Sequence, residues 1–435
     1  MATASVSLDQ TLADFMADCY ADPLAFVLGA YPWGEPGPLK DHPGPDEWQA
    51  DLLRTIGKAV RGHKFNGTKP VPPIRAAVSS GHGIGKAQPS DAVIPTPDGD
   101  RRFGDLCPGG RVWGRDGTPT RVVAVHEQGV LPTYRVRFDD GSEARVTGDH
   151  LWSVRGRQQR RNGLGWATMT TKGILNSGVK RPNGVAQARQ WEIPTSAAVD
   201  LPPVDLPLDP YALGVWLGDG SRCGARFTSA DSEVIGTLRN RGMVVVKNAA
   251  KYQWAMAGVA VALRVLGVFL NYSYQKRVPV AYINASAEQR AWLLRGLLDT
   301  DGECTPGGSV GFSSTSRPLV ADVVRLARSL GGKAQHHPSV HKPKYPDAEG
   351  HLLAGRDSFR ATVTMPDGFA PFTIERKAAR VKPVQDRYRH RWIDSIEPDN
   401  ETDCRCITVA AADGLYLTND YIVTHNSVMA AWLVD

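Results

Sequence analysis

The stretch Ser79-Ser-Gly-His-Gly-Ile-Gly-Lys86 determines how this chain is organised, because it begins a motif that it does not complete. A P-loop needs Ser or Thr directly after its lysine, at the start of a helix, but Ala87-Gln-Pro follows here. The missing continuation is Ser427-Val-Met-Ala-Ala-Trp-Leu-Val-Asp435 at the far end of the sequence. Joining the two pieces restores a glycine-rich loop that runs into an apolar helix. Residues 87–426 are therefore interpreted as an insert.

Length and composition favour a multidomain cytoplasmic protein. The chain has 435 residues, 42% of them hydrophobic, which predicts two to four domains. It contains no apolar run long enough to span a bilayer, and its first residues lack the basic region of a secretion signal. The six cysteines are thinly spread, without paired CxxC spacing, which fits a reducing cytosol in a bacterial or phage-infected cell.

The net positive charge of the chain is confined to the insert. Residues 1–86 carry 8 Lys/Arg and 9 Asp/Glu, and residues 427–435 carry one Asp. Because the whole chain has a net charge of +6, residues 87–426 must carry +8. A basic excess of this kind favours a nucleic-acid partner, although a solvated basic surface is the alternative.

The hydrophobic pattern changes several times along the chain. A helix is expected over Asp46–Arg61 and a short buried strand over Ile74–Val78, which feeds the glycine-rich loop. Short alternating strands then dominate, with Asp139-Asp140-Gly141 as a hairpin turn, before helices and strands mix. We therefore expect an all-β domain interrupted by an α/β domain and preceded by a partial P-loop NTPase segment. The predicted boundaries are 1–86, 87–204, 205–390, 391–426 and 427–435.

Three motifs in the β segments resemble those of inteins, whose Hint splicing domain is an all-β horseshoe. Thr147-Gly-Asp-His150 resembles the TxxH motif near the upstream junction, and Cys406-Ile-Thr-Val409 resembles the strand before the downstream junction. Thr424-His425-Asn426-Ser427 resembles the downstream junction itself. Each motif alone has little value, but their order and the split P-loop make the resemblance specific.

Ala87 departs from the common intein pattern, because it has no nucleophile where most inteins have Cys or Ser. Class 3 inteins instead use Trp two residues after the TxxH histidine, Cys at the start of the late strand motif and Thr before the final His-Asn. This chain has all three, as Trp152, Cys406 and Thr424. An engineered Cys→Ala block at position 87 is the alternative, but it leaves this triplet to chance.

The resemblance implies a role for each of these residues. Cys406 attacks the Lys86 carbonyl, since a thiol ionises more readily than a hydroxyl and is a good acyl nucleophile. His150 protonates the leaving nitrogen, and Thr147 helps to stabilise the oxyanion. The acyl group then passes to Ser427, Asn426 cyclises with help from His425, and an ester-to-amide shift completes splicing. This chemistry needs no cofactor.

Two further segments resemble the LAGLIDADG (DOD) motif of homing endonucleases. They are Ala212-Leu-Gly-Val-Trp-Leu-Gly-Asp-Gly220 and Leu294-Arg-Gly-Leu-Leu-Asp-Thr-Asp-Gly302, 82 residues apart. Small residues allow the two helices to approach closely, which would bring Asp219 and Asp301 together as Mg²⁺ ligands. Lys276 matches the lysine that would act on a phosphate or a water. The resemblance implies a monomeric endonuclease that cuts double-stranded DNA of the intein-free allele, with no membrane partner.

The flanking segments resemble the start of a phage terminase large subunit, the ATPase of a DNA-packaging motor. In the rejoined loop, ATP phosphates and Mg²⁺ would be bound by Gly81, Gly83, Gly85, Lys86 and Ser427. The sequence contains no Walker B acid or nuclease domain of that host, so we expect no ATPase activity from this polypeptide. ATP binding is expected only in a complete spliced host.

Two other functions would each explain part of the sequence. A homing endonuclease with an inert β domain would not need the junction motif, and an intact P-loop ATPase would not have Ala87-Gln-Pro after its lysine. A self-splicing intein that carries a homing endonuclease explains both features.

Overall fold

A computed structural model describes residues 8–36, 43–45, 47–62, 87–183, 186–346 and 351–425. The expected strand 74–78, both halves of the P-loop, Asn426 and Ser427 lie outside the described residues. The helices before the insert belong to one compact unit, and the described residues from Ala87 to His425 belong to a second. Each unit is described by itself.

Three helices form the described part of the first unit: α1 (Leu8–Cys19), α2 (Pro23–Ala30) and α3 (Glu47–Gly62). The Asp22 carboxylate caps α2, accepting a hydrogen bond from the Ala25 N–H at 3.1 Å. The helix expected over Asp46–Arg61 is confirmed as α3. In the part of the chain that the structure describes, no helix is long and apolar enough to cross a membrane.

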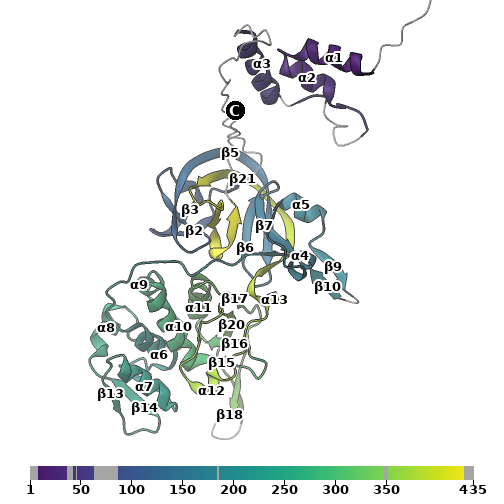
Figure 1. Cartoon of the computed structure of the whole chain (residues 1–435). Helices are drawn as coiled ribbons and strands as arrows, with labels where there is room; N and C mark the ends of the chain where they lie inside the picture. The colour runs from purple at the N-terminus through teal and green to yellow at the C-terminus, as the bar shows by residue number, and fades with distance from the viewer. Residues whose placement is uncertain are drawn as a thin grey trace, which may run out of the picture. The chain divides into compact units, whose positions relative to one another are not determined.

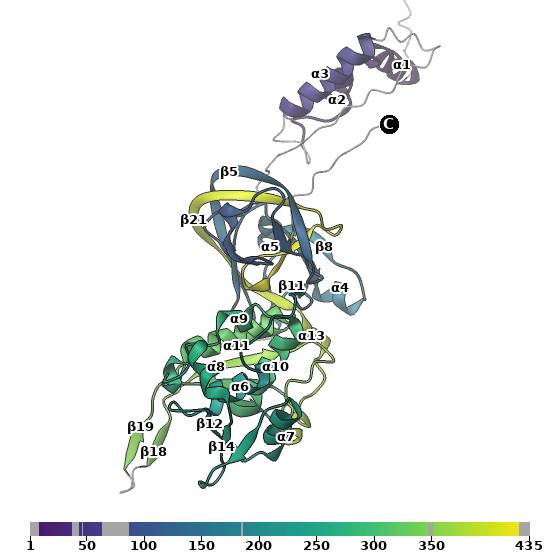
Figure 2. The same cartoon turned by 90° about the vertical axis from the view of Figure 1, so that its left-hand side faces the viewer.

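Two long antiparallel strands, β5 (Pro119–Phe138) and β21 (Arg391–Val409), form the frame of the β domain. Figures 1 and 2 show them curving together, although more than 250 residues separate their sequences. Register shifts, one of them between Cys404 and Arg405, bend the pair. The predicted turn at Asp139-Asp140-Gly141 is confirmed: Gly141 has φ +72°, which a glycine adopts without strain.

The remaining strands of the β domain pack around this pair. The sheet runs β4-β5-β21-β11-β7-β8, with β1 on β21 and β6 on β5. The domain is not purely β, because it contains two short helices, α4 (Arg157–Arg161) and α5 (Thr171–Asn176). A separate hairpin of β9 (Lys180–Asn183) and β10 (Ala186–Arg189) lies outside the main sheet. The other strand bounds are β1 (Gln88–Pro89), β2 (Val93–Thr96), β3 (Gly99–Arg102), β4 (Arg111–Trp113), β6 (Glu143–Thr147), β7 (Leu151–Gly156), β8 (Ala167–Thr170), β11 (Trp191–Ile193), β22 (Leu415–Leu417) and β23 (Val423–His425).

An α/β domain lies between β11 and β21 in the sequence and has a hydrophobic core of its own. Its described residues contain three small antiparallel sheets, β12-β14-β13, β15-β16-β20-β17 and the two-stranded β18-β19. The expected interruption of a β domain by an α/β domain is therefore confirmed. The described α-helices are α6 (Pro210–Asp219), α7 (Ser232–Asn240), α8 (Val259–Val265), α9 (Val280–Ile283), α10 (Ala287–Asp301), α11 (Arg317–Ser329), α12 (Glu375–Ala378) and α13 (Asp386–Arg389). The strands are β12 (Arg226–Thr228), β13 (Val245–Lys247), β14 (Gln253–Met256), β15 (Gly302–Cys304), β16 (Val310–Ser314), β17 (Lys333–His336), β18 (Lys344–Pro346), β19 (Leu352–Ala354) and β20 (Phe359–Thr364).

Helices α6 and α10 cross at a pair of glycines. A Cβ on Gly214 would lie 2.5 Å from the Leu293 carbonyl oxygen, and a Cβ on Gly296 would lie 2.4 Å from the Tyr211 carbonyl oxygen. The two helices therefore touch backbone to backbone, as the small residues of the repeated motif predict. Both figures show α6 and α10 side by side inside this domain.

A buried ion network joins the α/β domain to the β domain. The Asp140 carboxylate pairs with Arg391 at 2.8 Å and with Arg328 of α11 at 3.8 Å. All three side chains are less than 10% exposed. Burial alone would raise the pKa of Asp140, but the charges of the two arginines and a hydrogen bond from Ser142 lower it well below its ordinary value.

Replacing Gly214 with alanine should destabilise the α/β domain by about 1–3 kcal/mol, because the new methyl group has no room at the helix crossing. Gly236 of α7 is the matched control, since a Cβ there meets nothing within 4 Å. Gly236→Ala should be neutral or should stabilise by roughly 0.5–1 kcal/mol. Urea unfolding of both variants measures the difference, and equal midpoints would contradict the close crossing.

The network makes stability depend on pH in a defined direction. Because folding lowers the pKa of Asp140, its contribution is present above the unfolded pKa of about 3.9 and is lost as the pH falls further. Asp140→Asn should cost about 3–5 kcal/mol near neutral pH, because two buried arginines lose the carboxylate that they share. Thermal melting from pH 7 to pH 3 should show a shallower acid-side loss for the variant, whereas parallel curves would be evidence against this network.

Candidate active sites

Ala87, the first residue of the insert, is held inside the β domain by Thr147. It is completely buried, and its N–H donates to Thr147 Oγ1 at 3.0 Å. In return, the Thr147 N–H and hydroxyl donate to the Ala87 carbonyl oxygen at 3.0 and 3.2 Å. Thr147 thus contacts the nitrogen that would leave when the preceding peptide bond is broken. Sequence reasoning had assigned Thr147 to the oxyanion instead, and that role stays a prediction because Lys86 is outside the described residues.

Strand β1 places Ala87 beside Cys406. Gln88 pairs with Arg405 and Pro89 with Cys404 in an antiparallel register, which leaves the position before Gln88 opposite Cys406. Ala87, Cys404 and Cys406 accordingly form one buried cluster. The Cys406 thiol is 2% exposed and accepts a long hydrogen bond from Gln128 Nε2 at 3.9 Å. The proposed nucleophile and the upstream junction are therefore neighbours.

Three polar residues that sequence reasoning missed fix β1 in this register. Gln88 Nε2 donates to the Tyr416 hydroxyl at 3.1 Å, and the Thr418 hydroxyl donates to Gln88 Oε1 at 2.7 Å. All three residues are buried. Their contacts span more than 300 positions of the sequence, so no local pattern could have indicated them.

Cys404 lies on the same face of β21 but has different surroundings. It is completely buried, and its Sγ donates to the Thr402 carbonyl oxygen at 3.2 Å. Burial, followed by the charge of Asp403, raises the pKa of this thiol to about 11. A thiolate at this position is therefore disfavoured at neutral pH.

His150 and Trp152 connect the TxxH motif to the downstream junction. His150 Nε2 is hydrogen-bonded to the Thr424 hydroxyl, and both residues are completely buried. The imidazole packs edge-on against Trp152, with ring centroids 5.1 Å apart. Trp152 Nε1 in turn donates to the Thr171 hydroxyl at 3.0 Å, which donates to the His150 carbonyl oxygen at 3.2 Å. Trp152 therefore supports the histidine through Thr171, which no sequence motif had indicated.

Thr424 occupies β23, where it pairs with Tyr416 of β22, and His425 follows it as the last described residue. The structure thus brings Thr147 to Ala87, Ala87 to Cys406, and His150 to Thr424. Lys86, Asn426 and Ser427 lie outside the described residues, as do Gly81, Gly83 and Gly85 of the phosphate site.

The second candidate site lies where the two crossing helices end. Asp219 is the last residue of α6 and Asp301 the last of α10. Burial, followed by the charge of Asp219, raises the pKa of Asp301 to about 7. Burial also raises the pKa of Asp219, against the opposing charges of Lys276 and Lys377. Two partly desolvated carboxylates therefore share one site, as the duplicated motif predicts.

Lys276 caps the end of α6. Its Nζ is buried and donates to the carbonyl oxygens of Trp216 at 3.0 Å, Gly218 at 3.3 Å and Gly220 at 2.9 Å. Burial lowers its pKa to about 8, despite the neighbouring carboxylates. The role predicted for it, acting on a phosphate or a water, stays a prediction.

Lys377 of α12 makes the equivalent contacts at the end of α10, and sequence reasoning missed it. Its Nζ donates to the carbonyl oxygens of Leu298 at 3.0 Å, Thr300 at 3.3 Å and Gly302 at 2.6 Å. These positions follow the three partners of Lys276 by 82 residues each, which is also the spacing of the two motifs. A lysine in a generally basic stretch gives no signal by itself; only the internal repeat could have indicated it.

The acidic pair has the chemistry to bind a divalent cation. Among the described residues, no group of three or more His, Cys, Asp or Glu side chains could hold a metal ion. Two carboxylates do fit Mg²⁺, which takes one or two carboxylates and completes its shell with waters and phosphate oxygens. The raised pKa of Asp301 also fits, because a cation would relieve the repulsion from Asp219.

Comparison with known proteins bears on the α/β domain first. Residues 288–364 match the family model described as a LAGLIDADG-like domain. This confirms the expected resemblance for the second motif copy, since Asp301 lies within the match.

Two curated relatives carry the name replicative DNA helicase DnaB. One, from Mycobacterium intracellulare, is 32% identical over 376 residues, which cover 81% of this chain and 60% of the relative. The other, from Mycobacterium leprae (strain TN), is 32% identical over 141 residues, 29% of this chain and 23% of the relative. The chain thus spans about 60% or less of the relatives it matches. The first match must run largely through 87–426, because the flanking segments form less than a quarter of the chain.

Solved structures resemble the chain more weakly. A crystal structure of the MchDnaB-1 intein has 13% identity and a TM-score of 0.25, covering 78% of this chain and all of that chain. The crystal structure of I-DmoI in complex with DNA and Ca has 12% identity and a TM-score of 0.27, covering 40% and 95%. At such scores the fold rests on the contacts described above. None of these comparisons supports a terminase as the host.

Cys406→Ala should abolish splicing, whereas the matched Cys404→Ala variant should still splice. The reason is position and environment: Cys406 lies across from Ala87, while Cys404 faces Pro89 and its thiol resists ionisation. Denaturing gels of both purified precursors give the answer. Ligated product from the Cys406→Ala chain would refute the assignment of the nucleophile.

Proposed function

We propose that residues 87–426 are a class 3 intein that splices itself out and carries a site-specific DNA endonuclease. The splicing part of this proposal rests on the surroundings of Ala87. This residue has no nucleophilic side chain, its amide is hydrogen-bonded to Thr147, and it packs against Cys406. In an intein that begins with its own nucleophile, this cysteine would not be needed there.

The first chemical step exchanges an amide for a thioester. The Cys406 thiolate adds to the Lys86 carbonyl carbon, and the bond to the Ala87 nitrogen breaks as that nitrogen takes a proton. Thr147 holds the leaving nitrogen, which keeps the scissile peptide aligned with the thiol. His150 is the proposed acid in this chemistry.

The later steps transfer the acyl group and free the insert. The Ser427 hydroxyl attacks the thioester, loses its proton and regenerates the Cys406 thiol, giving an ester-linked branch. The Asn426 side-chain nitrogen then closes on its own carbonyl carbon and expels the Ser427 amino group. That amine attacks the ester, leaving Lys86 joined to Ser427 by a peptide bond. The hydrogen bond between His150 and Thr424 supports a histidine that serves both junctions.

The endonuclease half rests on the paired carboxylates at the ends of α6 and α10 and on the LAGLIDADG-like match. Asp219 and Asp301 would hold Mg²⁺, which activates water and stabilises the leaving oxygen when bound. Lys276 and Lys377 reduce the repulsion between the acids and keep the helix ends fixed. The proposed substrate is double-stranded DNA that encodes the rejoined loop, because the insert divides that sequence.

For the host, we propose a P-loop ATPase whose loop is completed by joining Lys86 to Ser427. A terminase large subunit of a packaging motor is the host that the flanking sequence resembles. The helicase name of the relatives belongs to those proteins, and the match to the Mycobacterium intracellulare relative runs largely through the insert. ATP binding and a cytoplasmic location remain parts of this proposal.

Intact-mass analysis of the purified 435-residue chain tests the splicing half. Splicing should convert it into a 340-residue insert and a 95-residue ligated fragment, as the junctions after Lys86 and after Asn426 require. A precursor that stays at full mass over days, while remaining folded by thermal melting, would rule the splicing proposal out.

Plasmid cleavage tests the endonuclease half. A plasmid carrying the uninterrupted loop codons should be cut with Mg²⁺, and a plasmid carrying the insert should not. Asp301→Asn and Asp219→Asn should each abolish cutting, because the metal loses a ligand. Asp205→Asn, at an exposed position, is the matched control and should cut normally. Cutting by the Asp301→Asn variant at the unchanged rate would contradict the assigned site.

A further inference from the structure

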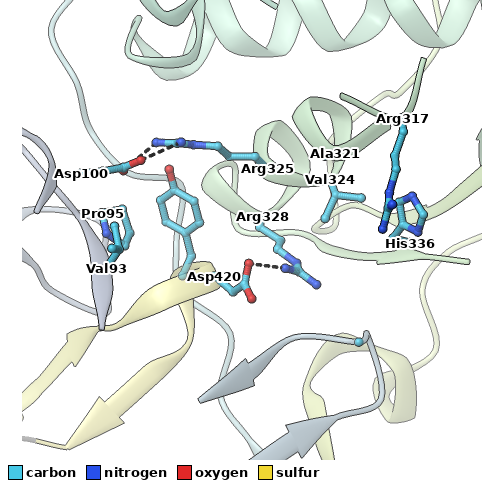
Figure 3. A pocket seen from close by; sticks show the side chains of 12 residues that line it. Val93, Pro95, Asp100, Arg317, Ala321, Val324, Arg325, Arg328, His336 and Asp420 are labelled. Atoms are coloured by element: carbon cyan, nitrogen blue, oxygen red, sulfur yellow. Dashed lines mark hydrogen bonds and ion pairs between the residues drawn. The ribbon is translucent and has the colours of Figure 1, made fainter. Parts of the chain in front are cut away.

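The β domain and helix α11 line an open pocket of about 400 Å³, whose walls include Asp420 and Tyr421. Figure 3 shows arginines of α11 reaching across it toward acids of the β domain. Arg325 pairs with Asp100 through two contacts of 2.7 and 2.9 Å, and Arg328 pairs with Asp420 at 2.5 Å. The acids come from β3 and from the turn just before β23. The proposed nuclease therefore contacts the proposed splicing domain at a specific turn.

That turn has an unfavourable backbone conformation. Asp420 and Tyr421 have φ values of +56° and +54°, in the left-handed region that non-glycine residues rarely adopt. Two such residues in succession persist only when their surroundings hold them. The turn ends at Ile422, and the chain then enters β23 with Thr424 and His425.

The surrounding contacts come from both domains. Arg391 of the β domain donates to the Tyr421 carbonyl oxygen at 2.8 Å and to the Asp420 carbonyl oxygen at 3.1 Å. The Asp420 side chain, in contrast, is paired with Arg328 of the α/β domain. Arg328 is itself fixed by hydrogen bonds to the carbonyl oxygens of Asp140 and Ala334, both at 3.0 Å. The guanidinium is thus a rigid support and not a mobile surface charge.

We propose that Arg328 is a positioning residue for the downstream cleavage of splicing. By holding Asp420, it keeps the left-handed turn that directs β23, and with it Thr424 and the chain leading to Asn426. The inference rests on the proposed splicing function. It gives the α/β domain a second role: one of its helices helps to shape the splicing site of the β domain.

The two junctions offer a readout that separates positioning from general destabilisation. Ala87 is held by Thr147 and Cys406, whereas Arg328 contacts a different set of residues, Asp420, Asp140 and Ala334. An Asn426→Ala precursor treated with thiol reports only the upstream cleavage after Lys86. A Cys406→Ala precursor reports only the release of residues 427–435 by Asn426. Each background is then combined with Arg328→Ala.

Arg328→Ala should slow the downstream release roughly tenfold or more, since a misplacement of about 1 Å can cost about 10²-fold. The upstream cleavage should keep its rate, and Arg328→Lys should recover part of the downstream rate by restoring a charge near Asp420. Arg376→Ala is the matched control, because it breaks an ion pair of 2.7 Å with Asp231 within the α/β domain. That variant should leave both rates unchanged.

An unchanged downstream rate in Arg328→Ala would overturn the inference. Equal slowing of both cleavages would also overturn it, because that pattern indicates lost stability. If the unmodified 435-residue chain forms no spliced product, the proposed function itself fails, and the inference fails with it. If that chain splices, but the Arg328 variants release residues 427–435 at the unchanged rate, only the inference about Arg328 fails.

Discussion

The reciprocal hydrogen bonds between Ala87 and Thr147 are the constraint on which the rest of this account depends. They bury the first residue of the insert, which has no reactive side chain, and fix it in register with β21. A buried amide must find partners, because an unsatisfied one costs about 1–3 kcal/mol. Once Thr147 supplies them, the position next to Gln88 falls opposite Cys406. A thiol far away in the sequence thereby becomes a neighbour of Ala87.

A different constraint shapes the second site. The backbone contact at Gly214 and Gly296 brings two helix ends together, and each ends in a carboxylate. The carbonyl oxygens exposed at a helix end favour a cation. Lys276 and Lys377 supply this positive charge through equivalent contacts. The carbonyl oxygens that accept from the two lysines belong to residues 82 positions apart in the sequence. Burial, followed by the charge of Asp219, still raises the pKa of Asp301, and a divalent cation would offset both effects.

Much of this arrangement was predictable from sequence, because the informative signals were local or repeated. The turn at Gly141, helix α3 and the crossing of the duplicated motifs follow from turn chemistry, helical period and small-residue spacing. Residues that act through distant contacts were not predictable: Thr171 supports Trp152, Tyr416 fixes Gln88, and Lys377 mirrors Lys276. The short helices α4 and α5 also escaped notice, since five or six residues carry little periodicity. The contact of Thr147 with the Ala87 nitrogen could not be read from the motif either, because a motif names residues without giving their orientation.

Asp140, Arg391 and Arg328 link the two domains through buried ion pairs, so the packing of each domain depends on the other. The proposed splicing chemistry requires Cys406 to carry the acyl group released from Ala87. Trapping that species tests it most directly. In a Ser427→Ala precursor, the next transfer is blocked, and peptide mass spectrometry should find a thioester between the Lys86 carbonyl and Cys406 Sγ, sensitive to hydroxylamine. An acyl group on Cys404, or no thioester in a folded precursor, would contradict the account.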